Sequence, residues 1–335
     1  MEGFRAMGKK VISTTFRFLC VLALPAALVL LFSLLAPGFG ISSLPLVLKQ
    51  AMIPTLMGIG MAFGQVAGIF DLSVGSRVVL AATVGGLLGN MFGLPGLIAG
   101  SLLGGIVPAV VMGQLYNALR LPSLVLSLGF VMILEIITCF AMNNTGQMAV
   151  SPDIAILGKS PWNFILVAIC GVIFYILFYH TRFSYNVRVV GNNELLAKNM
   201  GINIRRTYFL CFFVGGIFIG IVGILQLCYA NSVSASVQMG SMALVFKPMM
   251  GVMIGMELMS LLDNFVIDIL VGEICISIIF NGLIALGFSA TMQDVALGVF
   301  MLIVMAGSAN RDKLSAGKRI SRSQNLAGRA AQLTK

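Results

Sequence analysis

Residues 208–230 read YFLCFFVGGIFIGIVGILQLCYA, a run of 23 residues without a charged side chain. A helix needs about 20 predominantly apolar residues to cross the hydrocarbon core of a bilayer, so this run predicts a transmembrane helix. The whole chain has the same character: 59% of its 335 residues are hydrophobic and only 10% are charged, whereas soluble domains contain about 25% charged residues. This composition excludes a soluble enzyme, a secreted disulfide scaffold, a coiled coil and a disordered chain.

Similar apolar runs recur along the chain and predict about ten transmembrane helices. We expect these helices at residues 18–36, 51–70, 77–93, 96–118, 122–141, 162–180, 208–230, 242–261, 265–286 and 291–308. The predicted fold is therefore all-α, a polytopic membrane helical bundle. Its predicted parts are a cytoplasmic N-terminal segment at 1–17, a transmembrane domain at 18–308 and a basic cytoplasmic tail at 309–335.

The positions of the basic residues predict the orientation, because cytoplasmic loops of membrane proteins carry an excess of Lys and Arg. If both termini are cytoplasmic, 18 of the 21 Lys and Arg residues fall in cytoplasmic segments. The opposite side receives only Lys49 and Lys159, and Lys247 lies within a span. Basic residues of the tail suit a topology anchor near anionic lipid, so we expect a bilayer and no nucleic acid as its partner.

Motifs of a membrane enzyme are missing from the sequence. It has no GxxxxGK[ST] phosphate loop, so ATP hydrolysis would require a separate subunit. The six cysteines lie in apolar runs without a CxxC pair, and the single histidine, His180, stands at the end of a span. We therefore expect no catalytic residue, no cofactor and no metal site.

Glycine spacing predicts tight helix packing, because small residues on one helix face let backbones approach closely in lipid. Glycines repeat every four residues within several predicted spans: Gly60, Gly64 and Gly68; Gly96, Gly100 and Gly104; and the pairs Gly216/Gly220 and Gly251/Gly255.

Polar residues within the predicted spans are the candidates for a translocation pathway, since a charged side chain in a bilayer usually faces a cavity or a partner. Asp71 precedes the third span, where its carboxylate could equally cap the helix. Glu135 lies mid-span and must face protein or water. Asp268 and Glu273 are five residues apart, about 140° around a helix, so we expect no shared carboxylate site.

The segment 181–207 is the most informative loop, because it predicts a short amphipathic helix between two spans. Asn193 can cap this helix, Glu194 suits its positive N-terminal end, and Gly201 suits its C-terminal stop. Such a helix could act as a lever for a soluble partner, although a plain connecting loop is the alternative.

Four stretches resemble the ten-span permease subunits of bacterial ABC importers for monosaccharides, which are related to the branched-chain amino-acid permeases. Residues 68–76, GIFDLSVGS, resemble the family signature GGIDLSVGS, with Ile69 in place of a glycine. Residues 117–129 resemble a turn that ends in PPFIVTLG, and residues 191–202 resemble the coupling helix GGNEEAARLSGI. Residues 280–287 resemble NNGLNLLG.

The resemblance implies the permease subunit of a type II-like ABC importer in a bacterial cell membrane, for a monosaccharide or a related polar solute. It implies a cytoplasmic ATPase subunit, a second permease subunit (identical or a sibling) and an extracytoplasmic substrate-binding protein. The coupling candidates are Gly191, Asn193, Glu194, Ala197 and Gly201. The candidates for the translocation pathway are Asp71, Ser73, Glu135, Lys247 and Asn281.

Residues 244–264 depart from the family pattern, because Lys247, Glu257 and Asp263 stand where the family has aspartate, threonine and arginine. Lys247 could pair with Glu257 or Asp268, and an altered surface favours a heteromeric assembly. Two other functions stay open. One is an ion-coupled secondary carrier, which the intramembrane charges favour, and the other is a structural permease subunit that conducts nothing.

Overall fold

The computed structural model describes residues 21–36, 38–143, 146–259, 264–289, 292–293, 295–296, 298–300, 302 and 306. The predicted terminal segments 1–17 and 309–335 lie outside the described residues, as do Asp263 and much of the last predicted span. Within the described part, seven helices are long and apolar enough to cross a membrane, and a shorter apolar helix covers Val21–Leu35. The predicted all-α membrane class is confirmed.

The elements follow one another in a helical order with one small sheet. In chain order they are η1 (Ile41–Ser43), α2 (Leu44–Val66), α3 (Val74–Leu119), α4 (Ser123–Ala141), β1 (Gln147–Ala149), η2 (Ala155–Gly158), α5 (Trp162–His180), α6 (Arg182–Asn192), α7 (Glu194–Asn199), α8 (Ile204–Ala230), β2 (Ser232–Ser234), η3 (Gly240–Met242), α9 (Ala243–Leu258) and α10 (Phe265–Ala285).

Two predicted spans form the arms of one helical hairpin within α3. Gly93 has φ 68° and ψ −152° inside this helix and breaks it, a conformation that glycine adopts without steric cost. The second arm then packs on the first: a Cβ at Gly100 would lie 2.7 Å from the carbonyl oxygen of Val84, and one at Gly104 would lie 2.8 Å from the Cα of Ala81. The predicted glycine stripe of this span is therefore the seam of the hairpin.

Helix α8 packs against the second arm of α3 at equally short range. A Cβ added to Gly105 would lie 2.5 Å from the backbone nitrogen of Gly220, and one added to Gly220 would lie 2.9 Å from the Cα of Leu102. Gly215 of α8 faces the carbonyl oxygen of Gly60 on α2. Helix α8 thus holds α2 and α3 together through backbone contacts that no larger residue permits.

A second glycine seam joins α9 to α10. Gly272 of α10 lies against the backbone of Gly251, and a Cβ at Gly255 would lie 2.9 Å from the backbone nitrogen of Ile269. Both predicted pairs, Gly216/Gly220 and Gly251/Gly255, therefore lie in helix contacts, as close packing in lipid requires.

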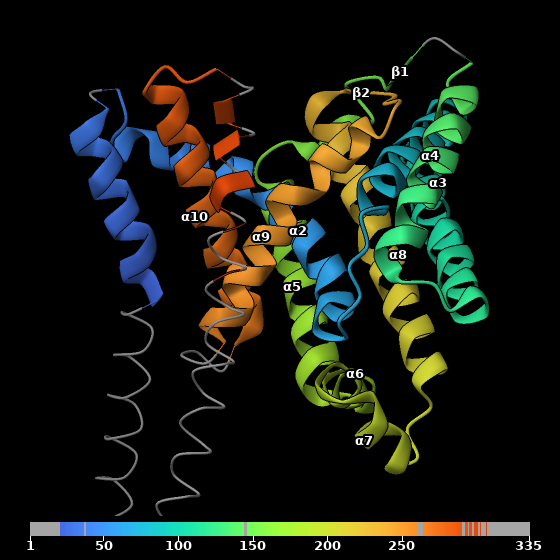
Figure 1. Cartoon of the computed structure of the whole chain (residues 1–335). Coiled ribbons are helices and arrows are strands. Elements are labelled where there is room, and N and C mark those ends of the chain that lie inside the picture. The colour runs from blue at the N-terminus through green and yellow to red at the C-terminus, as the bar shows by residue number, and fades with distance from the viewer. Residues whose placement is uncertain are drawn as a thin grey trace, which may run out of the picture.

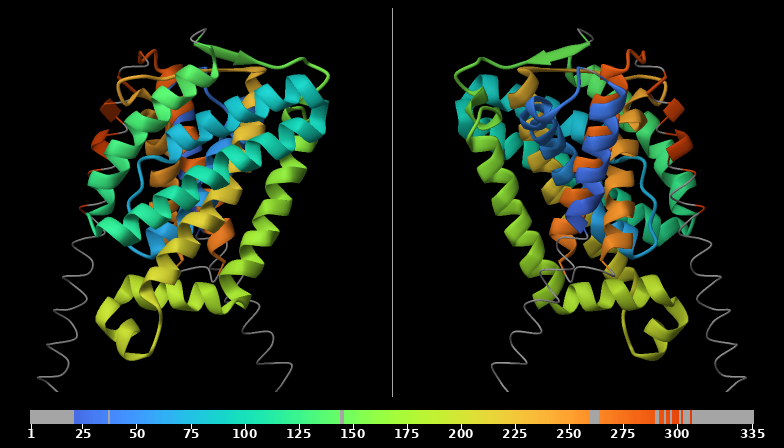
Figure 2. Two further views of the ribbon diagram at one scale, coloured as in Figure 1. Left: turned by 90° about the vertical axis from the view of Figure 1, so that its right-hand side faces the viewer. Right: turned by 90° about the vertical axis from the view of Figure 1, so that its left-hand side faces the viewer.

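The two ends of the bundle are different (Figure 1). At one end β1 and β2 pair antiparallel, with Met148 opposite Val233. At the other end α6 lies crosswise below the membrane-spanning helices and leads into α7 (Figure 2). We call these the sheet end and the α6–α7 end.

The start of α2 corrects the sequence prediction. The predicted span began at residue 51, but the helix begins at Leu44, with Pro45 in its first turn, where a proline costs no hydrogen bond. Lys49 and Gln50, which were placed in a loop, are therefore helical residues.

We expect Gly105→Ala to destabilise the bundle, because the added methyl group would force the backbones of α3 and α8 apart. Overpacking of this kind costs about 1–3 kcal/mol. The thermal unfolding midpoint of the purified protein in detergent measures the effect. Gly129→Ala is the matched control, since a Cβ at Gly129 meets nothing within 4 Å; equal midpoints for the two variants would contradict the packing argument.

Candidate functional site

A cavity of about 340 Å³ lies among five helices in the half of the bundle toward the sheet end. Its walls come from the first half of α2, the first turn of α3, the last turns of α8, the first turns of α9 and the end of α10. The polar residues that line it are Lys49, Gln50, Gln226, Tyr229 and Lys247. Sites for small molecules have volumes of roughly 300–1,000 Å³, so the cavity can hold one small polar solute.

Lys247 lines this cavity from α9. Its ammonium nitrogen lies 5.1 Å from the ring centroid of Phe280, within the range of a cation–π contact. The acid whose charge acts on it is Glu273, whereas the sequence proposed Glu257 or Asp268. The reason is geometric: Glu273 packs against Gly251, one helical turn beyond Lys247 on the same face of α9.

Asn281 stands directly behind the cavity wall. Its side-chain amide donates hydrogen bonds to the Oε1 atom of Gln50, at 2.6 Å, and to the carbonyl oxygen of Ser277, at 2.8 Å. Gln50 itself lines the cavity. Asn281 therefore fixes the orientation of a lining side chain and does not line the cavity itself.

Glu135 is a positioning residue, away from the cavity. Its carboxylate accepts hydrogen bonds from the backbone N–H groups of Met239 and Ser241, both at 2.9 Å, and from the Ser241 hydroxyl at 2.5 Å. The side chain is almost completely buried. Since these partners form the turn that precedes α9, Glu135 ties α4 to the start of the helix that carries Lys247.

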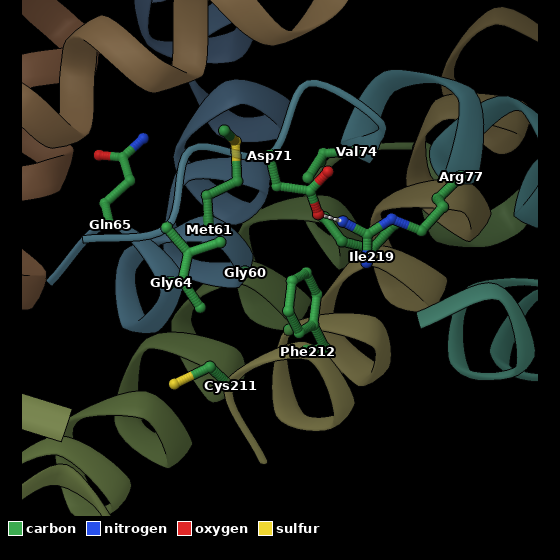
Figure 3. A pocket seen from close by; sticks show the side chains of 12 residues that line it. Gly60, Met61, Gly64, Gln65, Asp71, Val74, Arg77, Cys211, Phe212 and Ile219 are labelled. Carbon is green, nitrogen blue, oxygen red and sulfur yellow. Dashed lines mark hydrogen bonds and ion pairs between the residues drawn. The ribbon is translucent and has the colours of Figure 1, made fainter. Parts of the chain in front are cut away.

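Asp71 and Ser73 organise the turn before α3; Figure 3 shows Asp71 beside Arg77. The Asp71 carboxylate accepts hydrogen bonds from the backbone N–H of Ser73, at 2.9 Å, and from its hydroxyl, at 2.6 Å. It also pairs with the buried guanidinium of Arg77. The adjoining pocket measures about 30 Å³, which suits a water molecule and not a sugar. Asp71 therefore holds the turn before α3 and the Arg77 guanidinium; it does not cap the helix, because α3 has no side-chain cap hydrogen bond.

The predicted lever consists of two helices. Asn193 separates α6 from α7 and caps α7, because its side-chain oxygen accepts a hydrogen bond from the N–H of Leu196 at 3.0 Å. Gly201 ends the turn after α7 with φ 76°, and Ala197 is completely buried on the inner side. The predicted cap and stop are confirmed.

Gly191 belongs to α6 and not to the short helix in which the sequence placed it. A Cβ at this position would collide with the carbonyl group of Val66 and lie 3.2 Å from the Cα of Ala67. Only glycine lets the end of α6 rest directly on the C-terminal end of α2. The residue therefore connects the α6–α7 segment to a helix that lines the cavity.

Glu194 makes a second connection, because its carboxylate accepts a hydrogen bond from the hydroxyl of Tyr208 on α8. The ring of Tyr208 in turn lies edge-on to Tyr116 of α3, with centroids 5.4 Å apart.

On the outer side of α7 the apolar side chains of Leu195, Leu196 and Met200 are 75%, 53% and 52% exposed.

The family model for the branched-chain amino acid transport system permease component matches residues 44–305. The chain belongs to this permease family. It is therefore a multi-span membrane protein of a bacterial permease family, and the resemblance drawn from its motifs is confirmed.

The permease is similar to several curated proteins of Escherichia coli (strain K12). It is 28% identical to the probable ABC transporter permease protein YphD, over 93% of this chain and 95% of the relative. It is 27% identical to the galactofuranose transporter permease protein YtfT, over 79% of each chain. It is 23% identical to the ribose import permease protein RbsC, over 83% of this chain and 89% of the relative. No solved structure matches it.

Sequence reasoning missed four of the polar residues that line the cavity: Lys49, Gln50, Gln226 and Tyr229. Lys49 and Gln50 were placed in a loop because the start of α2 was predicted too late. Gln226 gave a usable signal, since it is a lone amide between Leu225 and Leu227 in an otherwise apolar run.

We expect Glu135→Ala to lower the thermal unfolding midpoint markedly, because it leaves a buried backbone N–H group, a partly buried one and a hydroxyl without their acceptor. Each hydrogen bond to a charged group contributes about 1.5–3 kcal/mol. Glu135→Gln retains one acceptor oxygen and should fall between Glu135→Ala and the wild type. Ile137→Val, at a half-exposed position of the same helix, serves as the control; a midpoint for Glu135→Ala equal to that of the control would contradict the anchoring role.

Proposed function

We propose that this permease is the transmembrane subunit of an ATP-driven ABC importer for a monosaccharide or a related small polar solute. The names of its relatives, a galactofuranose transporter permease and a ribose import permease, support the solute class. A cavity of about 340 Å³ with a partly polar wall is consistent with it. The observation that carries the proposal is the exposed apolar face of α7.

The outer face of α7 requires a protein partner in this proposal. Its leucine and methionine side chains lie beyond the end of the spans, where water and not lipid would surround them. Clustered apolar side chains at such a position mark an interaction surface. A soluble ATPase subunit that grips α7 would cover them, and the family's ATP hydrolysis would then occur on that separate subunit.

Two contacts would carry a movement of the α6–α7 segment into the bundle. The backbone contact of Gly191 with Val66 leads to α2, and the hydrogen bond between Tyr208 and Glu194 leads to α8. Both α2 and α8 line the cavity. ATP-driven closure of two ATPase subunits would therefore change the access to the cavity through rigid helices.

The orientation follows from the same assignment. The α6–α7 end would face the cytoplasm, in agreement with the five Lys and Arg residues between positions 181 and 207, and both termini would be cytoplasmic. The sheet end would face an extracytoplasmic binding protein that delivers the solute. A second permease subunit, identical or a sibling, would complete the assembly in the bacterial inner membrane.

An ion-coupled secondary carrier is the second candidate, because Lys247 and the buried Glu273 are titratable groups within the bundle. A secondary carrier functions without an ATPase subunit, so the exposed apolar face of α7 would have no partner. This face therefore favours the importer. Solute uptake that continues in vesicles without ATP and responds to an ion gradient would favour the carrier.

We expect Leu195→Glu to abolish co-purification of the proposed ATPase subunit and to reduce ATP-dependent uptake at least tenfold, since the new carboxylate would have to be buried in the interface. The amount of permease in the membrane should not change. Ile156→Glu is the matched control, because it introduces the same charge at a half-exposed position of η2, toward the sheet end. ATPase binding that survives in Leu195→Glu would refute the role of α7.

We also expect Glu194→Lys and Gly201→Val to abolish uptake while the protein stays in the membrane. The first variant replaces the acceptor of the Tyr208 hydroxyl, and the second places a β-branched residue at φ 76°. Tyr208→Phe should give an intermediate loss, since it removes only the hydrogen bond. Uptake at the wild-type level in both Glu194→Lys and Gly201→Val would exclude the coupling assignment.

A further inference from the structure

Among the residues that the structure describes, the charged side chains that line the cavity all have the same sign. Lys49 and Lys247 contribute two ammonium groups, and none of the aspartate and glutamate residues that the structure describes belongs to the lining. The remaining polar groups of the wall are the side-chain amides of Gln50 and Gln226 and the phenol of Tyr229. Charges of one sign along a cleft with low-dielectric walls concentrate ions of the opposite sign.

The ammonium group of Lys247 has unused hydrogen-bond capacity. Within the described part of the chain it makes the cation–π contact with Phe280, but no hydrogen bond and no ion pair within 4.0 Å is found for it. A lysine ammonium has three donors, and an ionisable residue inside a membrane protein usually faces a functional partner. An anion in the cavity would supply the acceptors that the protein does not.

Glu273 lies near Lys247 without closing off the cavity. Its carboxylate is completely buried where α2, α9 and α10 meet, against Gly58 and Gly251, and it is not part of the cavity lining. Its interaction with Lys247 is electrostatic, and the two groups are not within the range of an ion pair. The side of Lys247 that faces the cavity therefore remains available to a ligand.

Gln50 adds a donor that is held in place. Its Oε1 atom accepts the hydrogen bond from Asn281, so its amide NH₂ group is the part left to donate into the cavity. No hydrogen bond is found for that NH₂ group, for the amide of Gln226 or for the hydroxyl of Tyr229 among the described residues. Groups of this kind recognise carboxylate or phosphate oxygens and sugar hydroxyls.

We propose that the solute of this cavity is an anionic monosaccharide, a sugar acid or a sugar phosphate, and that Lys247 and Lys49 bind its negative charge. This inference rests on the proposed import function and specifies its solute class. Lys247 would make the buried contact with the anionic group, and Lys49, which is exposed at the start of α2, would attract the anion to the cavity. The amides and the phenol would bind the hydroxyl groups.

The experiment measures binding to the purified full-length permease in nanodiscs of zwitterionic lipid, by isothermal titration calorimetry at constant ionic strength. The probes are glucuronate, glucose 6-phosphate and glucose, so that the two anion types and the neutral sugar are compared on one ring. The variants are Lys247→Gln, Lys247→Arg and Lys49→Gln. Lys159→Gln is the control, because Lys159 is exposed and does not line the cavity.

We expect at least one of the two anions to bind at least tenfold more tightly than glucose. Lys247→Gln should weaken anion binding at least tenfold and Lys49→Gln about threefold, while Lys247→Arg and Lys159→Gln retain it. If Lys247→Gln fails to fold, the exposed Lys49→Gln variant still tests whether a positive charge at the cavity contributes to anion binding. Equal binding of glucose and the anions, no binding of either anion, or unchanged anion binding in both glutamine variants would each overturn the proposal.

The outcome is independent of the proposed coupling to an ATPase, because no ATPase takes part in the binding measurement. Loss of anion binding together with ATP-dependent uptake of a neutral sugar would refute the anionic solute and leave the importer intact. Anion binding without any ATP dependence of uptake would refute the importer and leave the solute class intact.

Discussion

Direct contact between helix backbones at glycine is the constraint on which the rest of this structure depends. Helices in lipid gain no hydrophobic free energy from associating, so their contacts rest on the fit of their surfaces. The seams between the arms of α3, between α3 and α8 at Gly105 and Gly220, and between α9 and α10 at Gly251 and Gly272 all bring main chains together. Helices that approach so closely hold their neighbours at fixed positions.

The cavity exists because these seams leave other faces of the same helices apart. Helix α3 begins inside the bundle, after the turn that Asp71 stabilises, and contributes Val78 of its first turn to the wall. Glu135 fixes the turn before α9, and Asn281 fixes Gln50 on α2. Polar side chains outside the cavity thus determine which polar side chains line it.

These close helix contacts are compatible with the proposed function, in which a soluble partner at the α6–α7 end moves the helices that line the cavity. Helix α6 rests on the end of α2, α7 is hydrogen-bonded to α8 through Glu194 and Tyr208, and both α2 and α8 line the cavity. Lys247 lies on the cavity wall. One helical turn further along α9, Gly251 packs against Glu273 of α10 in the α9–α10 seam. The position of the Lys247 ammonium group, to which we assign solute binding, therefore depends on the same close packing.

The membrane class, most spans, the glycine faces of α3, α8 and α9 and the cap and stop of α7 could be predicted from the sequence, because each depends on residues that are neighbours along one helix; the predicted face of Gly60, Gly64 and Gly68 could not, since Gly68 lies beyond the end of α2 with φ 80°. The cavity lining could not, since Lys49, Gln226 and Lys247 come from three helices that only packing brings together. Glu135 likewise could be identified as buried but not as an anchor, because its partners lie more than 100 residues away. The spacing of residues along the sequence determines which face of a helix carries small or polar side chains, and the tertiary structure determines which residues that face contacts.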